Sequence, residues 1–177
     1  MGMLDGKTAL IFGVANSRSI AWGIAQALYR EGAQLAFSYA GPALLRRVAP
    51  LAKQVGANFV EPCNLARDED LETLFTKVST DMGNIDILIH SVAFANRDEL
   101  NGPYYATSRE GFRIALDVSC YSFTTIVRHA LSLFNPGSSC LTMTYYGAEK
   151  AVPHYNVMGV AKAALEASVR YLAADLG

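Results

Sequence analysis

The chain has 177 residues, 51% hydrophobic and 18% charged, which is enough for one domain with a buried core over residues 1–177. Its 15 basic residues balance 16 acidic ones, so we expect no nucleic-acid partner and no anionic membrane surface. The sequence contains no bilayer-length apolar run and no secretory signal, which predicts a cytoplasmic protein. Cys63, Cys120 and Cys140 lack motif spacing, so we expect small buried side chains rather than disulfides or a metal site.

Strand and helix patterns alternate along the chain. Short apolar runs indicate buried strands, and apolar residues at helical spacing indicate helices. In chain order, the pattern predicts strand Thr8–Phe12, helix Ser19–Glu31, strand Leu35–Tyr39, helix Pro42–Val55, strand Phe59–Pro62, helix Asp68–Met82, strand Ile85–His90, helix Thr107–Phe134, strand Ser139–Thr144 and helix His154–Leu176.

Several residues are typical of helix ends. We expect Asp68 to be an N-cap, and Thr107 with Glu110 to form a capping box. Pro50 predicts a break or a new start within its helix. The run Asn135-Pro136-Gly137 is expected to end the long helix before it.

Five strands that alternate with helices imply a parallel sheet covered on both faces. Right-handed crossovers make this a Rossmann-like, doubly wound α/β fold with strand order 3-2-1-4-5. A fold of this kind hosts many activities, so function has to be argued from the site.

The loop after the first strand stands where a dinucleotide-binding fold carries its glycine fingerprint, although G-x-G-x-x-G itself is absent. Gly13 permits a tight turn, and the small Ala15 lets a phosphate approach the backbone. The helix start at Ser19 and Ile20 favours an anion. An ordinary strand-to-helix loop capped by Ser19 explains the same residues, but its place in the first βα unit favours a nucleotide.

Residues at the ends of later strands are candidates for the rest of a cofactor site. No acid ends the second strand, where Ala40 stands, so the sequence leaves NADH and NADPH both open. Asn64 and Leu65 follow the third strand, at the place for an adenine contact. Ser91 and Val92 follow the fourth strand and are expected to floor the site.

Two tyrosine–lysine pairs follow the fifth strand. In short-chain reductases, a lysine holds the nicotinamide ribose and supports a tyrosine hydroxyl that hydrogen-bonds a developing oxyanion. Tyr146 and Lys150 have the usual Tyr-x3-Lys spacing, but Pro153 places them in a loop. Tyr155 and Lys162 are seven residues apart, which puts them on one face of a helix, about 10 Å apart along its axis. We prefer the second pair, although a boundary tyrosine and a surface lysine are common on any amphipathic helix.

Beyond these motifs, the chain resembles bacterial NADH-dependent enoyl-[acyl-carrier-protein] reductase, a member of the short-chain dehydrogenase/reductase superfamily. The resemblance runs from about Gly6 to the last residue. The Tyr-x6-Lys spacing, with a further tyrosine ten residues upstream, separates this family from Tyr-x3-Lys carbonyl reductases. The resemblance is carried by the segments Ser19–Gln26, Arg30–Phe37, Arg109–Ile114, Asn135–Ser138 and Tyr146–Ala161.

The resemblance implies a function in fatty-acid biosynthesis and lipid metabolism: reduction of the C2–C3 double bond of a trans-2-enoyl thioester on acyl carrier protein. The catalytic residues would be Tyr145, Tyr155 and Lys162, with Tyr145 equally suited to shaping the pocket. The substrate would contact Ala95, Tyr145, Tyr155 and Met158. NADH would contact Gly13, Ala15, Ser19, Ile20, Ala40, Asn64, Leu65, Ser91, Val92 and Lys162.

Departures from the family pattern leave alternatives open. Ala40 and Asn64 replace a common glutamine and aspartate, so NADPH is not excluded. Family members continue through two more strands, so we interpret the chain as C-terminally incomplete and expect Ser139–Thr144 to be an exposed edge. The alternatives are a non-catalytic NAD(H)-binding fragment and a carbonyl reductase that uses Tyr146 and Lys150.

The resemblance also implies a homo-oligomer, in family members a homotetramer. It would pair the predicted helices Thr107–Phe134 and His154–Leu176. Their apolar residues include Ile126, Val127, Leu131, Leu165 and Leu172, some of which must pack on the sheet instead.

Overall fold

The computed structural model describes residues 2–177, which form two compact units. The first unit runs to Ser91 and includes Val127–Thr142, and the second comprises Val92–Ile126 and Met143–Gly177. Among the described residues, no helix combines the length and the apolar character needed to cross a membrane.

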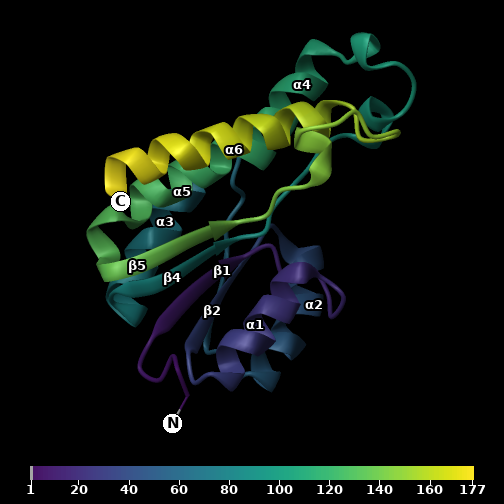
Figure 1. The fold of residues 1–177 in the computed structure, drawn as a ribbon. Helices are drawn as coiled ribbons and strands as arrows, with labels where there is room; N and C mark the ends of the chain where they lie inside the picture. Colours follow the sequence, from purple (N-terminus) through teal and green to yellow (C-terminus); the bar gives the residue numbers. More distant parts are fainter. Residues whose placement is uncertain (1) are drawn as a thin grey trace. The chain divides into compact units, whose positions relative to one another are not determined.

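The first unit is built on a five-stranded parallel sheet (Figure 1). Its order, β3-β2-β1-β4-β5, confirms the predicted doubly wound topology. The strands are β1 (Thr8–Phe12), β2 (Gln34–Tyr39), β3 (Phe59–Pro62), β4 (Ile85–His90) and β5 (Phe134–Thr142).

Helices cover this sheet, with α1 and α2 on one face and α3 on the other (Figure 1). They are α1 (Ile20–Arg30), α2 (Pro42–Gln54) and α3 (Asp68–Lys77), the last continued by the π-helical turn η1 (Val78–Met82). Alternate strand residues, including Ile11, Phe37 and Ile89, pack with Trp22 of α1 and Val48 of α2 in one buried cluster. In a sheet covered on both faces, alternate residues of a strand pack against one layer of helices and the residues between them pack against the other.

Two predictions about these helices were wrong. Pro50 does not break α2, which runs through it. The buried stripe of Val48, Leu51 and Ala52 outweighs the roughly 3 kcal/mol that an internal proline costs. Asp68 is the first helical residue rather than the N-cap, a position that Arg67 occupies. Its carboxylate still lies in the first turn, where the helix dipole favours a negative charge.

A buried carboxylate joins three strands of the first unit. Asp86 accepts hydrogen bonds from the Thr8 amide (3.0 Å), the Lys7 ammonium (2.9 Å) and the Asn135 side chain (3.1 Å). Burial alone would raise the pKa of Asp86, but these donors outweigh it and lower that pKa. The Lys7 side chain is 50% exposed, so water weakens the ion pair, and the Thr8 and Asn135 groups carry most of the stabilisation.

The second unit is mainly helical. It contains α4 (Arg109–Leu116), the π-helical turn η4 (Asp117–Tyr121) and α6 (Val157–Leu176). The short 3-10 helices are η2 (Arg97–Leu100), η3 (Tyr104–Ala106) and η6 (Tyr146–Ala148). Helix α5 (Ser122–Ala130) continues from η4 into the first unit and is followed there by the 3-10 turn η5 (Leu131–Leu133).

The predicted capping box is wrong by one residue. Ser108 caps α4, accepting a hydrogen bond from the Gly111 amide (2.9 Å). Glu110 forms an ion pair with Arg113 instead of accepting a hydrogen bond from the backbone amide of the N-cap residue. The carboxylate of Glu99, from η2, accepts the Ser108 amide hydrogen bond that a capping-box glutamate would take.

The fifth strand begins earlier than predicted. Asn135-Pro136-Gly137 lies inside β5 instead of ending a helix, and the register with β4 shifts between Ile85 and Ile87. An edge strand with a bulge tolerates proline because no neighbour needs its missing amide proton. As expected of an edge, Cys140 and Leu141 are exposed, so the prediction of three buried cysteines holds only for Cys63 and Cys120.

Candidate active site

The phosphate-binding turn predicted after β1 requires a glycine. Gly13 has φ +101°, and a Cβ at this position would lie 2.0 Å from the Ser91 carbonyl oxygen. No other residue type fits this close approach of two chain segments without moving them. The turn is therefore built on Gly13, as the sequence predicts.

Ser19 holds the N-cap position of α1, but its side chain bonds within the loop instead of capping the helix. Its hydroxyl donates to the Asn16 carbonyl oxygen (2.7 Å) and faces the Ala15 amide (3.4 Å). Within residues 2–177, no side chain caps the first turn of α1. The amide protons of Ile20 and its neighbour are left for water or an anion, at the positive end of the helix dipole. Ser19 is thus the N-cap by position, as the ordinary-loop alternative predicts, but without a side-chain hydrogen bond to the helix.

The residues predicted near the adenosine are placed at strand ends. Ala40 is exposed and directly follows β2. The Asn64 side-chain oxygen accepts from the Ala66 amide (3.1 Å), so its NH₂ group is what remains for a ligand. Leu65 is buried. The buried Cys63 beside them is unreactive, since burial raises the pKa of its thiol to about 12.

His90, at the end of β4, has a structural role. It is fully buried, and its Nδ1 lies 2.7 Å from the Thr142 hydroxyl of β5. Ser91 follows it and donates its amide proton to the Phe12 carbonyl oxygen (3.0 Å). These contacts fix the backbone beside Gly13 and leave the imidazole away from solvent.

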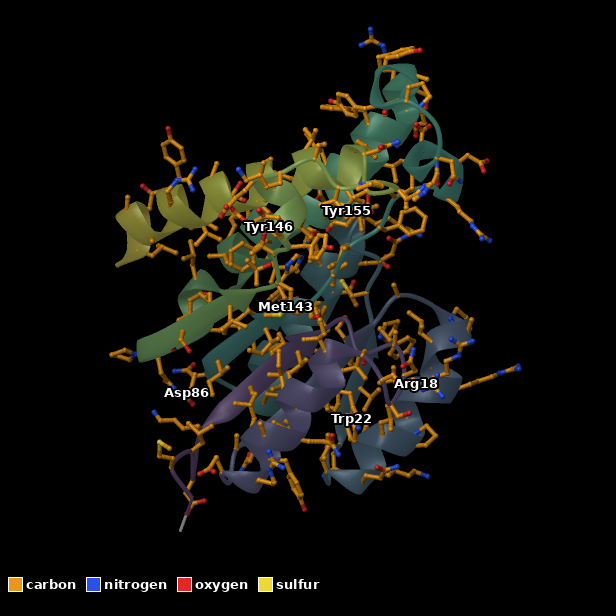
Figure 2. The ribbon with its side chains drawn as sticks, turned by 45° about the vertical axis from the view of Figure 1, so that its right-hand side comes forward. Arg18, Trp22, Asp86, Met143, Tyr146 and Tyr155 are labelled. Atoms are coloured by element: carbon orange, nitrogen blue, oxygen red, sulfur yellow. The ribbon has the colours of Figure 1, made fainter. Side chains whose placement is uncertain are left out.

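Tyr155 does not lie within the helix, contrary to the sequence-based expectation. Helix α6 begins at Val157, and Tyr155 lies in the turn that precedes it (Figure 2). His154 and Asn156 on either side have positive φ values of 60° and 37°, which interrupt the helical path. The Asn156 side chain donates to the Gly102 carbonyl oxygen (3.1 Å) and so helps to hold the turn.

The two predicted catalytic tyrosines are in contact. The rings of Tyr145 and Tyr155 meet edge to face, with centroids 4.8 Å apart. Burial raises the pKa of Tyr155, and the neighbouring Tyr145 raises it further. Tyr155 therefore stays protonated at neutral pH and is a hydrogen-bond donor.

Gly147 makes room for the Tyr155 ring. A Cβ at Gly147 would lie 2.4 Å from Tyr155 Cδ1, and a Cβ at Gly159 would lie 2.6 Å from the Gly147 carbonyl oxygen. Two glycines thus let the 3-10 turn η6 pack on the start of α6. No spacing pattern in the sequence indicates this role, because the contact joins residues eight positions apart in an irregular segment.

Lys162 is a buried cation. Its side chain is 4% exposed, and its ammonium donates to the Met143 carbonyl oxygen (2.8 Å). Burial lowers the pKa of this ammonium, an effect that Cys120 partly offsets. A lysine that is buried with so little compensation is typical of a functional position.

The predicted substrate residues gather in one small cluster. Ala95 and Tyr155 pack against the buried Met158, Val157 and Ala115. Tyr145 joins through its ring contact with Tyr155. The structure thus brings together all four residues that the resemblance assigned to the substrate.

The competing pair, Tyr146 and Lys150, is exposed. Tyr146 is 60% exposed, and the contact that it makes with Lys150 is a backbone one, from the Lys150 amide to the Tyr146 carbonyl oxygen (3.1 Å). Lys150 borders an open pocket of about 450 Å³ that Tyr155 also lines. A solvated tyrosine and lysine are poorly suited to stabilising an oxyanion.

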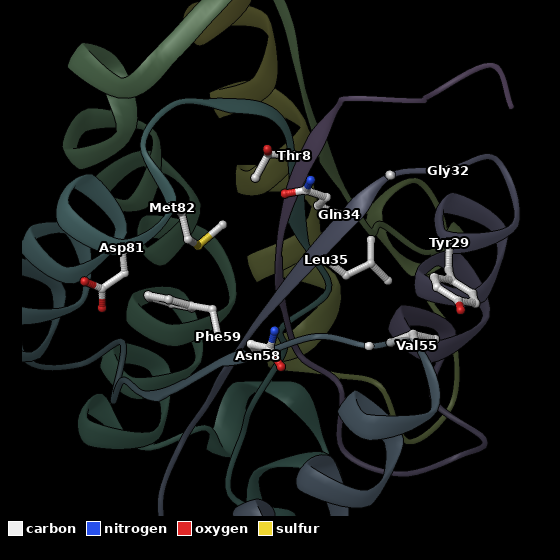
Figure 3. Close-up of a pocket in the computed structure, with 12 residues that line it drawn as sticks. Thr8, Tyr29, Gly32, Gln34, Leu35, Val55, Asn58, Phe59, Asp81 and Met82 are labelled. Atoms are coloured by element: carbon white, nitrogen blue, oxygen red, sulfur yellow. The ribbon is translucent and has the colours of Figure 1, made fainter. Parts of the chain in front are cut away.

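A larger hollow, of about 610 Å³, lies at the amino ends of the strands in the first unit (Figure 3). Its walls include Tyr29, Leu35, Phe59, Asp81 and Met82. In doubly wound folds, ligands bind at the carboxyl ends of the strands. Despite its size, this hollow is therefore not the candidate site.

Comparison with known proteins identifies the family. A family model described as enoyl-(acyl carrier protein) reductase matches residues 13–177. The Rhizobium meliloti (strain 1021) enoyl-[acyl-carrier-protein] reductase [NADH] 1 is 52% identical over 176 residues, covering 99% of this chain and 65% of that protein. This chain therefore spans just under two thirds of that relative's length.

Similarity to solved structures points to the same family. The crystal structure of the NADH enoyl-[acyl-carrier-protein] reductase from Aquifex aeolicus VF5 has a TM-score of 0.97 and 52% identity, covering 99% of this chain and 70% of that one. The Bacillus cereus enoyl-acyl carrier protein reductase, solved with NADP⁺ and indole naphthyridinone, has a TM-score of 0.97 and 49% identity, covering 100% and 70%. Both the sequence and the fold therefore show that the chain belongs to the enoyl-(acyl carrier protein) reductase family.

Proposed function

We propose that this chain reduces the C2–C3 double bond of trans-2-enoyl thioesters carried on acyl carrier protein, a step of fatty-acid synthesis, with NADH as the reductant. One observation carries the proposal: Tyr155 lies in an apolar cluster in ring contact with a second tyrosine, and a buried lysine, Lys162, lies seven residues further along the chain, in α6. The name of the Rhizobium meliloti relative supports the same substrate and cofactor.

Tyr155 would stabilise the charge that develops on the substrate. When bound, NADH supplies a hydride to C3, and negative charge moves to the thioester oxygen. The Tyr155 hydroxyl donates a hydrogen bond to that oxygen and holds the enolate until C2 is protonated. Its raised pKa keeps the proton in place at neutral pH, so the hydroxyl is ready to donate.

Lys162 would hold the nicotinamide ribose. An ammonium has three protons, and the Met143 carbonyl oxygen takes one of them, which leaves two for ribose hydroxyls. Its positive charge would also favour developing negative charge on the substrate. The burial of Lys162 strengthens both interactions because the local dielectric is low.

The first unit fits the phosphate end of a dinucleotide. Gly13 keeps side-chain atoms out of the turn, Ala15 and Ser19 have small side chains, and Ile20 presents its amide proton at a helix start. Ala40, Asn64, Leu65, Ser91 and Val92 are proposed as the remaining cofactor contacts. Ala40 supplies no acid for the adenosine ribose, so the assay must compare NADH with NADPH.

The acyl group would meet the cluster around Met158. Ala95 offers backbone to the thioester, Met158 offers a flexible apolar wall, and Tyr145 shapes the pocket by packing on Tyr155. Such a wall excludes water from the reacting carbons.

The assay is NADH consumption with a short trans-2-enoyl thioester, followed for the unaltered chain, Tyr155→Phe and the control Tyr146→Phe. We expect loss of at least 100-fold in kcat/KM for Tyr155→Phe and little change for Tyr146→Phe. The opposite order would support the carbonyl reductase that uses Tyr146 and Lys150. A folded chain that binds NADH without any turnover would support a non-catalytic NAD(H)-binding protein.

We propose that the chain forms a homo-oligomer, as a homotetramer in the cytoplasm. Three of the apolar residues considered for pairing, Ile126, Val127 and Leu165, are buried within the chain and are not available for it. Helix α6 nevertheless exposes Val169 and Tyr171, which supports an association surface on this helix. A monomer mass by light scattering at micromolar concentration would contradict this proposal.

A further inference from the structure

Ser119 is a buried polar residue that the reaction described above does not use. It lies in the π-helical turn η4 and is fully buried. Its Oγ accepts a hydrogen bond from the Phe94 amide (2.8 Å) and donates to the Phe94 carbonyl oxygen (3.0 Å). The same oxygen lies 3.7 Å from Met158 Sδ. One hydroxyl thus contacts both the loop after β4 and the wall of the candidate acyl pocket.

The segment that Ser119 holds has little other structure. Residues 91–96 are neither helical nor extended in a strand. The Phe94 side chain is 51% exposed, so burial of its ring does not fix it. Its main chain is fixed instead by the Ser119 hydroxyl, which meets both polar groups of the same residue.

This short segment carries proposed ligand contacts on both sides of Phe94. Val92 is the proposed cofactor contact and Ala95 the proposed substrate contact, and Ala95 also packs against Met158. A shift of the Phe94 main chain would therefore move the backbone that faces the thioester. π-helical turns occur most often at functional sites, and this one aims a serine at that backbone.

We propose that Ser119 is a positioning residue that sets the backbone at Ala95 for the thioester, acting through both main-chain groups of Phe94. This role rests on the function proposed above. Without the hydroxyl, the Phe94 amide loses its acceptor and the Phe94 carbonyl oxygen loses its donor, and the segment shifts to find other partners. We expect weaker binding of the substrate, and little effect on the chemical step at Tyr155.

The test compares Ser119→Ala with Ser119→Thr, which keeps the hydroxyl, and with Ser168→Ala as a matched control. The Ser168 hydroxyl donates to the carbonyl oxygen of Ala164 in its own helix (3.0 Å) and lies 3.5 Å from Cys120 Sγ, so this control removes a hydroxyl that contacts η4 and is not bonded to Phe94. Each variant is assayed for KM, kcat and the dissociation constant of NADH. The affinity for the enoyl thioester is also measured by calorimetry.

For Ser119→Ala we expect a KM and a thioester dissociation constant about tenfold higher, because both hydrogen bonds that hold the Phe94 main chain are lost, with kcat and the NADH dissociation constant within threefold of the unaltered chain. Ser119→Thr should recover the thioester affinity to within threefold, and Ser168→Ala should change neither. An unchanged KM in a folded Ser119→Ala variant would overturn the proposal. So would a lower melting temperature with kcat and all affinities reduced alike. If the unaltered chain neither binds nor reduces the thioester, the proposed function itself is wrong.

Discussion

The space beside Gly147 gives the sharpest prediction about the active site. Gly147→Ala places a methyl group 2.4 Å from Tyr155 Cδ1 and 2.7 Å from Cε1. Gly147 is not among the glycines with positive φ, so alanine suits its backbone. The methyl group acts mainly on the Tyr155 ring and more weakly on the Tyr145 ring, whose Cδ1 would lie 3.3 Å away.

The magnitude follows from the geometry. Non-bonded carbon atoms approach to about 3.5–4.0 Å, so the Tyr155 ring must move by roughly 1 Å. A displacement of roughly 1 Å at a reacting group costs about 100-fold in rate. We therefore expect kcat/KM to fall about 100-fold in Gly147→Ala, mostly through kcat, because the Tyr155 hydroxyl no longer meets the developing oxyanion.

The assay is NADH consumption under subsaturating thioester, with NADH affinity and melting temperature measured on the same sample. Gly23→Ala is the matched control: Gly23 lies in α1, and a Cβ there meets no atom within 4 Å. We expect the control to be fully active and slightly more stable. A Gly147→Ala variant within threefold of the unaltered kcat/KM would refute the claim that the ring position sets the rate.

Three further predictions test other parts of the molecule. Lys162→Met should lower turnover at least about 100-fold but leave the melting temperature unchanged or higher, since it removes a buried charge. Asp86→Ala should lower the free energy of unfolding by about 1–3 kcal/mol in urea titrations, because it strands buried donors. Because the folded pKa of Asp86 is lowered, this difference should be fully present at neutral pH and disappear as the pH falls below about 4. Gly13→Ala should abolish NADH binding in fluorescence titrations, since its Cβ would lie 2.0 Å from the Ser91 carbonyl oxygen; unaltered affinity would contradict the assigned turn.

The sheet could be predicted from the sequence because its strands carry continuous apolar runs. The run Ile85–His90 is mostly apolar, and a short run of this kind is typical of a strand buried on both faces of its sheet. Positive-φ glycines follow two of the helical segments: Gly32 follows α1, and Gly83 follows η1, which continues α3. Periodicity and glycine placement are local signals that indicate the elements, and the right-handed crossover rule then gives the strand order.

The local ends of elements could not be predicted as well. Tyr155 has helical spacing relative to Lys162, but His154 and Asn156 adopt positive φ and delay the helix to Val157. Periodicity does not reveal where a first turn begins. The run Asn135-Pro136-Gly137 predicts the end of a helix, although an edge strand accommodates these residues equally well.

The residues that arrange the candidate site were the least predictable. Gly147 and Ser119 act through contacts with residues that are distant in the chain or lie in irregular segments. No spacing rule connects Ser119 to Phe94, 25 positions earlier. The family resemblance, by contrast, did point to residues that lie together in the structure, among them Tyr145, Tyr155 and Met158.

Direct transfer of hydrogen between cofactor and substrate tests the central claim most directly. The chain is incubated with a trans-2-enoyl thioester and NADH that carries deuterium at both positions of nicotinamide C4, and the product is analysed by mass spectrometry and NMR. The account predicts one deuterium at C3, none at C2, and no labelled product from Tyr155→Phe on the same timescale. Deuterium-free product, or an unreduced thioester with NADH bound to the folded chain, would contradict it.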